Sequence, residues 1–313
     1  MPSSRKFVVT GGAGFIGSTL VRTLLGYGEV AVIDNLLTGR HENLDEVRRA
    51  IDFHPLDIRD TDVLEPVFRG AEVVFHLAAI PSVPRSIEDP EPSHEVNIDG
   101  SFNVFRAAVD AGVKRVIYAA SSSAYGDTEV LPKVETMAPR PKSPYAVQKL
   151  VGEYYASVFY NCYGLETVAL RFFNVYGPRQ DPSSPYSGVL SLFMKHLIAR
   201  TSPTIHGDGE QSRDFTYVED VAELCWKAVH APAAAGKMYN AGNGGKYTLN
   251  SIWKLLQEME GVKLPPKYSP PRAGDVRHSM ADTAAAARDL GHAPRFTIEE
   301  GLRKTLAWYR QSI

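Results

Sequence analysis

Five apolar stretches in the first half of the chain are continuous in hydrophobicity rather than alternating. They are Lys6–Thr10, Val30–Asp34, Val73–Ala78, Val113–Ala120 and Thr167–Phe173. Continuous apolar strands are typical of a parallel sheet that is covered on both faces. Segments with helical periodicity separate them, such as Gly14–Gly26 and Val96–Ala111. This alternation of strand and helix predicts an α/β fold with a doubly wound parallel sheet and right-handed crossovers.

The second half of the chain has a different pattern. Pro178–Ser187 is rich in proline and serine and is expected to form a loop. Turns are expected within Thr204–Phe215 and Lys237–Gly245, and proline interrupts Leu264–Ser269. Helices are predicted at Val189–Arg200, Leu249–Glu260, Ala281–Leu290 and Ile298–Arg310. We therefore expect a first domain over 1–173 and a smaller, mixed α/β lobe over 174–313, with a segment at about 214–243 returning to the first domain.

Composition narrows the class of protein without naming its function. The chain has 313 residues and a formal net charge of −2, which argues against a general binder of nucleic acid or of an acidic membrane surface. The two cysteines, Cys162 and Cys225, exclude a disulfide scaffold and show no zinc-binding spacing. We see neither a signal peptide nor an apolar run of roughly 20 residues. A cytoplasmic protein with no metal, membrane or nucleic-acid partner is expected.

A glycine-rich turn, Gly11-Gly-Ala-Gly14-Phe-Ile-Gly17, follows the first predicted strand and opens a helix. Glycine allows a tight turn and the close approach of a diphosphate to the backbone. The helix N-terminus adds free N–H groups and a favourable dipole. The second predicted strand ends in Asp34, at about the 20-residue offset expected for a ribose-binding carboxylate. The combination predicts a dinucleotide site.

Asp34 also bears on which dinucleotide binds. Its carboxylate can accept from both ribose hydroxyls and would repel a 2′-phosphate, so NAD is favoured over NADP. Arg40 lies nearby in the sequence and could reduce that repulsion, although an arginine in a turn is more often solvated. Asp57, after a presumed third strand, is either an acceptor for the adenine amino group or a plain turn or cap aspartate.

Tyr145 and Lys149 are four residues apart and would share one face of a helix. A free tyrosine titrates near pH 10, which is too high for a base at neutral pH, and a nearby ammonium lowers that pKa. The pattern alone occurs often by chance. Here it is accompanied by Ser121, which follows the fourth long apolar strand, where sheets of this type place active residues.

Six segments together resemble the extended short-chain dehydrogenase/reductase family: GGAGFIG, Asp34, HLAA (76–79), SSSAYG (121–126), SPYAVQK (143–149) and RFFNVYGPR (171–179). The resemblance covers essentially the whole chain. It implies a Rossmann-type domain, a bound NAD, and a catalytic triad of Ser121, Tyr145 and Lys149. His76 is expected to pack in the core or under a loop, and the thiols are expected to be structural.

The two residues after Ser121 point to the reaction within this family. The family's dehydratases carry an Asp-Glu pair there, and its decarboxylases have Glu at the second position, whereas this chain has Ser122 and Ser123. Without these carboxylates, only redox chemistry remains. Oxidation and re-reduction with inversion between them is epimerisation, so the resemblance implies a UDP-hexose 4-epimerase that acts through a transient 4-keto sugar.

The resemblance also implies residues at the sugar and diphosphate end. Arg213 and Arg272 match arginines that hold the diphosphate, and a bidentate arginine suits that geometry. Asn174 argues against a UDP-glucuronate 4-epimerase, which usually has Thr there. Ser279 matches a gatekeeper position, where a small residue leaves room for an N-acetyl group and Tyr restricts the enzyme to UDP-glucose and UDP-galactose. Pro81 departs from the glycine common in UDP-N-acetylglucosamine 4-epimerases.

The expected site therefore has three parts. The catalytic residues are Ser121, Tyr145 and Lys149. The expected cofactor contacts are Gly11, Gly14, Phe15, Ile16, Gly17, Asp34, Asn35, Asp57, Ile58, Leu77, Ala78, Ala79, Asn97, Tyr145, Lys149 and Phe172. The expected substrate contacts are Ser82, Ser121, Ser122, Ser123, Tyr145, Asn174, Gly188, Val189, Arg213, Arg272, Asp275 and Ser279.

Two other functions remain open at this point. One is a net NAD-dependent oxidoreductase, or a 4-reductase, on a nucleotide sugar. The other is a non-enzymatic NAD-binding regulator, although relatives of that kind commonly lose the Tyr or the Lys that this chain retains. The resemblance further implies a homodimer, formed by pairing two long helices that include the one carrying Tyr145.

Overall fold

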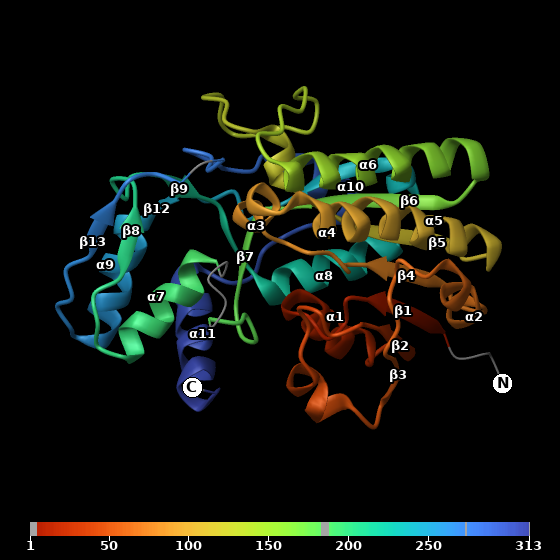
Figure 1. The fold of residues 1–313 in the computed structure, drawn as a ribbon, viewed down its shortest axis with the longest axis horizontal. Coiled ribbons are helices and arrows are strands. Elements are labelled where there is room, and N and C mark those ends of the chain that lie inside the picture. Colours follow the sequence, from red (N-terminus) through yellow and green to blue (C-terminus); the bar gives the residue numbers. More distant parts are fainter. Residues whose placement is uncertain (1–4, 183–187, 273, 313) are drawn as a thin grey trace.

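A computed structural model describes residues 5–182, 188–272 and 274–312 of the chain. A seven-stranded, all-parallel sheet lies at its centre, in the order β11-β6-β5-β4-β1-β2-β3 (Figure 1). Its strands are β1 (Lys6–Thr10), β2 (Glu29–Ile33), β3 (Ile51–His54), β4 (Val73–His76), β5 (Arg115–Ser121), β6 (Glu166–Phe172) and β11 (Lys237–Ala241). The predicted α/β class is confirmed, and each of the five expected strands lies within two residues of its predicted ends.

The order of the strands reverses between β1 and β4. From β1 the chain proceeds outward through β2 to β3, and from β4 it proceeds the other way through β5 to β6. Loops that leave the carboxyl ends of these two neighbouring strands therefore diverge, and a crevice opens between them. The candidate site lies at this point.

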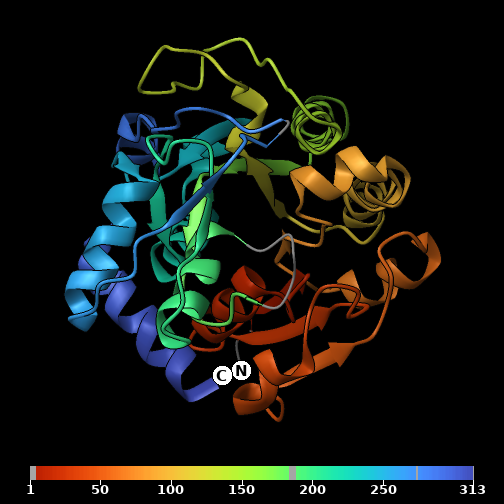
Figure 2. The same cartoon turned by 60° about the vertical axis from the view of Figure 1, so that its left-hand side comes forward.

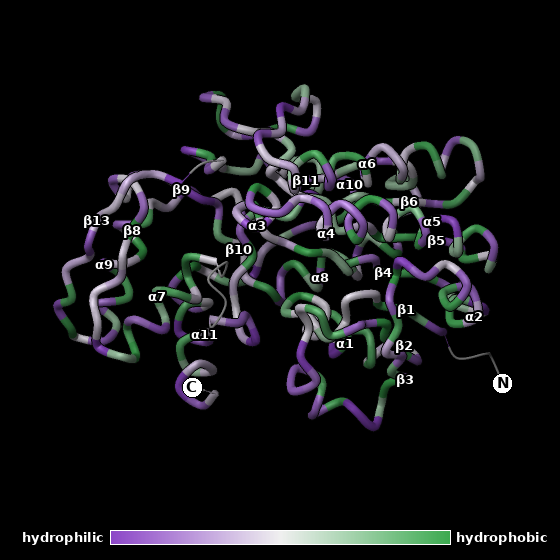
Figure 3. Tube along the Cα trace, viewed as in Figure 1, coloured by the Kyte–Doolittle hydropathy of each residue, from purple (hydrophilic) through white to green (hydrophobic). Residues whose placement is uncertain are grey.

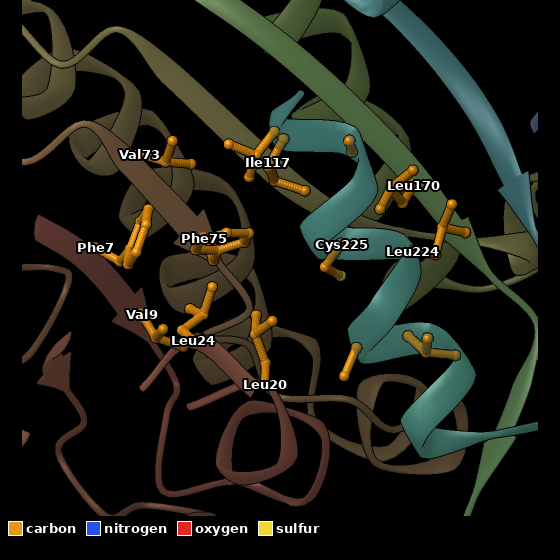
Figure 4. Packing of buried hydrophobic residues seen from close by; sticks show 14 of the residues in the cluster. Phe7, Val9, Leu20, Leu24, Val73, Phe75, Ile117, Leu170, Leu224 and Cys225 are labelled. Atoms are coloured by element: carbon orange, nitrogen blue, oxygen red, sulfur yellow. The ribbon is translucent and has the colours of Figure 1, made fainter. Parts of the chain in front are cut away.

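Alternate residues of the strands enter two different cores, because successive side chains point to opposite faces. Phe7 and Val9 of β1 pack with α1 (Phe15–Leu24) and α8 (Val218–Val229), as Figure 4 shows. Val8, between them, packs with α2 (Leu64–Phe68), α5 (Ser101–Asp110) and α6 (Pro144–Tyr163) on the other face. Both faces are thus covered by helices, which is why the strands are continuously apolar.

The helix predicted at Val96–Ala111 is part of a longer and less regular segment. It consists of α4 (Pro90–His94), a π-helical turn η3 (Glu95–Gly100) and α5. The other short helical elements are α3 (Val83–Glu88) and the 3-10 turns η1 (His41–Val47), η2 (Thr61–Val63), η4 (Ser122–Tyr125) and η5 (Pro232–Ala234). The π turn places an asparagine, Asn97, toward the interior.

The segment Lys237–Gly245, for which turns were expected, begins with the edge strand β11. β11 pairs with β6, and α8 precedes it on the face that α1 covers. The chain thus returns to the main sheet after having left it at β6. Beyond β11, α10 (Ala284–Leu290) also packs on this face through Ala286 and Leu290.

The remaining segments form a smaller lobe with its own core, at the left of Figures 1 and 2. Its helices are α7 (Val189–Ile198), α9 (Leu249–Glu260) and α11 (Ile298–Ser312). Its short strands pair as β7 (Asn174–Tyr176) with β10 (Phe215–Tyr217), β9 (Ser212–Arg213) with β12 (Tyr247–Thr248), and β8 (Thr204–His206) with β13 (Lys267–Ser269). In Figure 3 green, apolar residues are frequent along α7, whereas β9 and β13 are mainly purple and white. None of the described helices is both long and apolar enough to span a bilayer.

Candidate functional site

A cleft of about 470 Å³ opens at the carboxyl ends of the sheet strands. The residues expected to contact the cofactor line it, except Asn97: they are Gly11, Gly14, Phe15, Ile16, Gly17, Asp34, Asn35, Asp57, Ile58, Leu77, Ala78, Ala79, Tyr145, Lys149 and Phe172. Of the residues expected at the substrate, Ser121, Tyr145, Asn174 and Gly188 line the same cleft. The structure therefore brings most of the expected cofactor site to one place, next to the expected catalytic residues.

The turn between β1 and α1 requires glycine at particular positions. Gly11 has φ +73°, and a Cβ there would lie 2.6 Å from the backbone nitrogen of Ala78. A Cβ on Gly17 would lie 2.1 Å from the Gly11 carbonyl oxygen. The helix begins at Phe15, and no side chain caps its N-terminus. The turn exposes backbone without side chains, and the N-terminus of α1 offers uncapped N–H groups and the positive end of the helix dipole. These features suit the binding of a dinucleotide diphosphate.

Asp34 follows β2 and is held in place by the same turn. Its Oδ2 accepts from Ala13 N at 2.9 Å, and its Oδ1 accepts from Leu36 N at 2.8 Å. Burial raises the pKa of this carboxyl, which is 8% exposed, and the two backbone hydrogen bonds lower it. A fixed carboxylate at the edge of the cleft suits a ribose diol and disfavours a 2′-phosphate. The donors and acceptors present therefore fit NAD.

Asp57 has the contacts of a turn aspartate although it lines the cleft. It accepts from the backbone and guanidinium of Arg59 and, at 2.8 Å, from Asn35 Nδ2. These contacts lower the pKa of Asp57 to about 2, with the Arg59 side chain as the largest cause. Arg40 forms an ion pair with Asp181 at 2.5 Å, so it links the loop after β2 to the segment after β7.

Local capping fixes the helix that carries Tyr145 and Lys149. Ser143 Oγ accepts from Ala146 N at 3.2 Å, and Pro144 occupies the first helical turn. The Tyr145 backbone N–H donates to Ser86 Oγ of α3 at 3.1 Å. Burial raises the pKa of Tyr145, and a hydrogen bond with Ser121 lowers it. That Lys149 also lowers this pKa stays a prediction.

Lys149 lies beneath the helix against the sheet. Its Nζ donates to the Ala119 carbonyl oxygen of β5 at 2.9 Å and lies 5.0 Å from the centre of the Tyr118 ring. Burial lowers the pKa of Lys149 to about 8, while the Glu153 carboxylate one turn further along α6 raises it. Glu153 is itself held by Arg171 of β6 through two hydrogen bonds of 2.9 and 2.7 Å.

His76 is fully buried, as expected, and its hydrogen bonds determine its tautomer. Ser101 Oγ donates to the Asn97 carbonyl oxygen at 2.7 Å, so it can only accept from His76 Nε2–H at 2.9 Å. His76 Nδ1 then accepts from Thr10 Oγ1 at 2.8 Å, and Thr10 accepts from Ala78 N. This chain of hydrogen bonds supports the loop after β4, which lines the cleft.

Asn97 supports the same loop instead of lining the cleft. Its side chain accepts from Ile80 N at 2.8 Å, donates to Ile80 O at 3.2 Å, and donates to Gln148 of α6 at 2.9 Å. All its polar atoms are used in this way, and the residue is 1% exposed. The π turn directs Asn97 inward, so it does not line the cleft, and a direct contact with the cofactor stays a prediction.

Several residues expected at the substrate do not line the cleft. They are Ser82, Ser122, Ser123, Val189, Arg213, Arg272, Asp275 and Ser279. Ser82 caps α3, and Val189 begins α7. Arg213 forms an ion pair with Asp275 at 2.7 Å and donates to two carbonyl oxygens. Arg272 is exposed, and Ser279 is 9% exposed with no partner for its Oγ within the described chain.

Sequence reasoning missed part of the cleft. Its lining also includes Ile33, Leu37, Thr38, Leu56, Ile80, Val96, Ala119, Ala120, Phe173, Val175 and Gln180. Many of these residues lie at or just beyond the carboxyl ends of strands. That position could have identified them as part of the cleft from the sequence. Glu153 was also missed, although it lies four residues after Lys149 and therefore shares its helix face.

Comparisons with known proteins agree with this geometry. Residues 7–242 match the model of the NAD dependent epimerase/dehydratase family. A UDP-glucose 4-epimerase of Mycolicibacterium smegmatis is 39% identical over 311 residues, which cover 97% of this chain and 98% of that protein.

Two solved structures extend the similarity to the fold. A UDP-N-acetylglucosamine 4-epimerase from Methanobrevibacter ruminantium, in complex with UDP-N-acetylmuramic acid, superposes with a TM-score of 0.95 at 38% identity, covering 99% of both chains. A UDP-glucose 4-epimerase from Thermotoga maritima, with UDP-glucose, superposes with a TM-score of 0.94 at 39% identity, covering 98% of this chain and 99% of that one. The chain thus belongs to the NAD-dependent epimerase/dehydratase family, as an extended short-chain dehydrogenase/reductase of the nucleotide-sugar epimerase type, with NAD as its cofactor.

Proposed function

We propose that the protein interconverts the C4 epimers of a UDP-hexose, either UDP-GlcNAc and UDP-GalNAc, or UDP-glucose and UDP-galactose, or both pairs. The observation that carries this proposal is the meeting of Ser121, Tyr145 and Lys149 at the dinucleotide cleft, with serine at the two positions after Ser121. Without carboxylates at those positions, neither dehydration nor decarboxylation has its acid and base. The 4-epimerases among the similar proteins support the same reaction.

Tyr145 and Lys149 have separate tasks in this proposal. Tyr145 takes the proton of the sugar 4-hydroxyl and later returns it. Lys149, held against β5 by Ala119, supplies a positive charge near Tyr145 and binds the nicotinamide ribose. Bound NAD would accept a hydride from C4 and return it to the opposite face, so that the sugar passes through a 4-keto form. The chain's own residues hold the rest of the substrate while the 4-keto sugar rotates to present its other face.

Arg213 and Arg272 are proposed to hold the diphosphate during this rotation. Arg213 is fixed by the carbonyl oxygens of Ser212 and Arg277, which leaves its guanidinium plane well defined. A diphosphate that binds there would compete with Asp275 for Nη2. Because a diphosphate carries more negative charge than the half-exposed Asp275 carboxylate, we expect it to displace that carboxylate from Arg213.

A direct assay tests the proposal. The purified protein is incubated with UDP-GlcNAc and with UDP-glucose separately, and the C4 epimers are resolved by NMR. We expect epimer formation with no net NADH, and loss of turnover in Tyr145→Phe. Stoichiometric release of NADH would contradict epimerisation and indicate a net oxidoreductase, and NAD binding without turnover of either sugar would indicate a regulator.

We also propose that the protein is a homodimer. Val147, Tyr154 and Val158 are between 45 and 58% exposed and lie along one face of α6, at spacings of seven and four residues. Phe102 on the neighbouring α5 is 41% exposed. A second copy that covers this face would bury apolar area that water now contacts.

A further inference from the structure

The first turn of α6 needs an acceptor that the helix itself does not supply. The first N–H groups of an α-helix have no intrahelical partner. Pro144, the first residue of α6, has no N–H, and the N–H of Ala146 donates to the Ser143 side chain. Val147 N donates to the Ser143 carbonyl oxygen at 3.1 Å. Within this turn, the N–H of Tyr145 is thus the donor left without a partner in its own helix.

The acceptor for Tyr145 is Ser86 of α3, and the hydrogen positions in this contact are determined. Tyr145 N donates to Ser86 Oγ at 3.1 Å, and Ser86 Oγ donates its own hydrogen to the Val83 carbonyl oxygen at 2.8 Å. A backbone N–H can only donate and a carbonyl oxygen can only accept, so neither direction can be reversed. Ser86 is fully buried, so bulk water does not compete for its lone pairs.

The helix α3 joins this contact to the cofactor cleft and to the smaller lobe. The five residues before its cap, 77–81, all line the cleft, and Ser82 caps the helix. A Cβ on Gly274 of the smaller lobe would meet Ile87 Cδ1 of α3 at 2.9 Å, so the two segments are in contact. α3 thus connects a wall of the cleft and the smaller lobe to the turn that carries Tyr145.

We propose that Ser86 is a positioning residue for Tyr145, which fixes the first turn of α6 so that the phenolic oxygen stays within reach of the sugar 4-hydroxyl. This inference rests on the proposed epimerase function and deepens it, because it gives α3 a part in the reaction. Without the Ser86 hydroxyl, the Tyr145 N–H has no protein acceptor, and a helix end with an unpaired donor frays. A reacting group in a fraying turn spends less time at the distance that proton transfer requires.

The fold offers a matched control for the loss of a buried serine beside α6. Ser93 of α4 is 1% exposed, and its Oγ donates to the carbonyl oxygen three residues earlier, as Ser86 Oγ does. It also accepts from α6, but from the side chain of Gln148 and not from the backbone of Tyr145. Ser86→Ala and Ser93→Ala therefore remove the same kind of buried hydroxyl, and only Ser86→Ala frees the Tyr145 N–H.

Amide hydrogen exchange tests the contact without any turnover. The full chain is labelled with ¹⁵N-tyrosine, and the Tyr145 signal in the NMR spectrum is assigned by its loss in Tyr145→Phe. Losing one hydrogen bond should make this amide exchange about tenfold faster in Ser86→Ala, whereas Ser93→Ala should keep the wild-type rate. Equal exchange of Tyr145 in wild type and Ser86→Ala, or equal acceleration in both serine variants, would refute the inference.

Steady-state kinetics of the same variants measures the effect on the reaction. We expect kcat of Ser86→Ala to fall by about ten- to a hundredfold, with KM within about twofold, because a displacement on the order of an ångström at a reacting group costs that much. Ser93→Ala should keep kcat within about twofold. A rise in KM at unchanged kcat would overturn the inference, since Ser86 would then act on substrate binding. An equal loss of kcat in both variants would reduce its role to general stability.

A double-mutant cycle tests whether Ser86 acts through Tyr145. Tyr145→Phe already removes the phenolic oxygen, so adding Ser86→Ala should change the residual kcat by less than about twofold. Independent roles would instead multiply the two effects, and that result would contradict a positioning role. A wild type that fails to epimerise would refute the proposed function, while the exchange rate of the Tyr145 amide would still decide whether Ser86 holds this turn.

Discussion

Ser279 is the residue at which the preference for one sugar is most directly testable. Its side chain is nearly buried, and its covered hydroxyl has no hydrogen-bond partner in the described chain, so a larger side chain does not fit there without displacing its neighbours. Ser279→Tyr adds a ring there. We expect kcat/KM for UDP-GlcNAc to fall relative to UDP-glucose by at least about tenfold, since one misfitting group is worth about 1–3 kcal/mol.

Competition kinetics with both sugars measures that ratio, and Ser279→Ala is the matched control because it keeps the position small. An equal loss of activity toward both sugars in Ser279→Tyr would show that the ring disturbs the fold or the diphosphate site and does not select between 2-substituents.

His76 gives a prediction about stability and pH. Burial lowers its pKa to about 3, from an ordinary 6.5, so the unfolded chain binds a proton in this range that the folded protein does not. The free energy of unfolding should therefore fall as the pH drops from 6.5 toward 3, by at most about 5 kcal/mol. Above pH 6.5 this contribution is fully present, and below pH 3 it decreases no further.

Urea unfolding of wild type and His76→Asn at a series of pH values isolates this contribution. The other titrating groups are common to both proteins, so the wild-type curve should be steeper between pH 3 and 6.5 by the contribution of His76. Parallel curves would mean that His76 is not kept neutral by its buried hydrogen bonds with Thr10 and Ser101.

At the scale of single residues, sequence spacing predicted contacts that depend on regular structure and missed those that depend on a local irregularity. Tyr145 and Lys149 are brought to the cleft because four residues are about one helical turn. Asn97 is not, because a π turn rotates it toward Ile80 and Gln148. Nothing in the pattern of apolar positions distinguishes a π turn from an α-helix.

The contact between α6 and β5 depends on a glycine. A Cβ on Gly152 would lie 2.1 Å from Tyr118 Oη, and Tyr118 is fully buried beneath the helix. Gly152→Ala must therefore push α6 away from β5. Because the bond from Lys149 Nζ to Ala119 O joins the same two elements, we expect a loss of about 1–3 kcal/mol in the free energy of unfolding and a lower kcat.

Chemical unfolding and turnover of Gly152→Ala provide the measurement. Gly26→Ala is the control, because a Cβ there meets only Thr23 O at an ordinary 3.5 Å on the surface. A Gly152→Ala protein as stable and as active as Gly26→Ala would show that the helix tolerates the displacement.

Helices were predictable where apolar residues recur at helical spacing. Strands were less predictable where their pairing partners are distant in the sequence. Leu249–Glu260 was predicted as a helix and is one, since its apolar stripe faces the core of the lobe. Lys237–Ala241 is a strand only because β6 offers it an open edge to pair with. That edge is a property of the folded sheet, and a single-sequence pattern does not contain it.

The proposed dimer is a prediction about the whole molecule. If the apolar face of α6 pairs with a second copy, placing a charge there should separate the copies, because an unpaired buried charge is costly. We expect wild type to have twice the chain mass by light scattering, and Tyr154→Asp with Val158→Asp to have the mass of one chain.

The matched control is Val130→Asp, at a residue 60% exposed on the loop before α6, which should leave the mass unchanged. A wild type with the mass of a single chain would contradict the proposal outright. A double variant that keeps the dimer would place the interface on another face.

At this largest scale the sequence predicted an NAD-binding sheet and a second lobe, but not how the lobe's side chains meet the cleft. Arg213 ends the short strand β9, which pairs with β12, and Arg272 lies outside any helix or strand, so neither position follows from local periodicity. Arg213 is paired with Asp275, a partner 62 positions away. Such pairings arise from the folded arrangement of several segments.

The return of the chain to the main sheet has a consequence for how the protein is made. A nascent chain that has reached residue 173 contains β1 to β6 but neither α8 nor β11, so one edge of the sheet is open. The apolar side of α1 that packs with Val221, Leu224 and Cys225 is then exposed (Figure 4). The N-terminal half of the protein therefore completes its fold only after residue 241 has left the ribosome. Between the emergence of residue 173 and that of residue 241, the nascent chain most needs protection from aggregation.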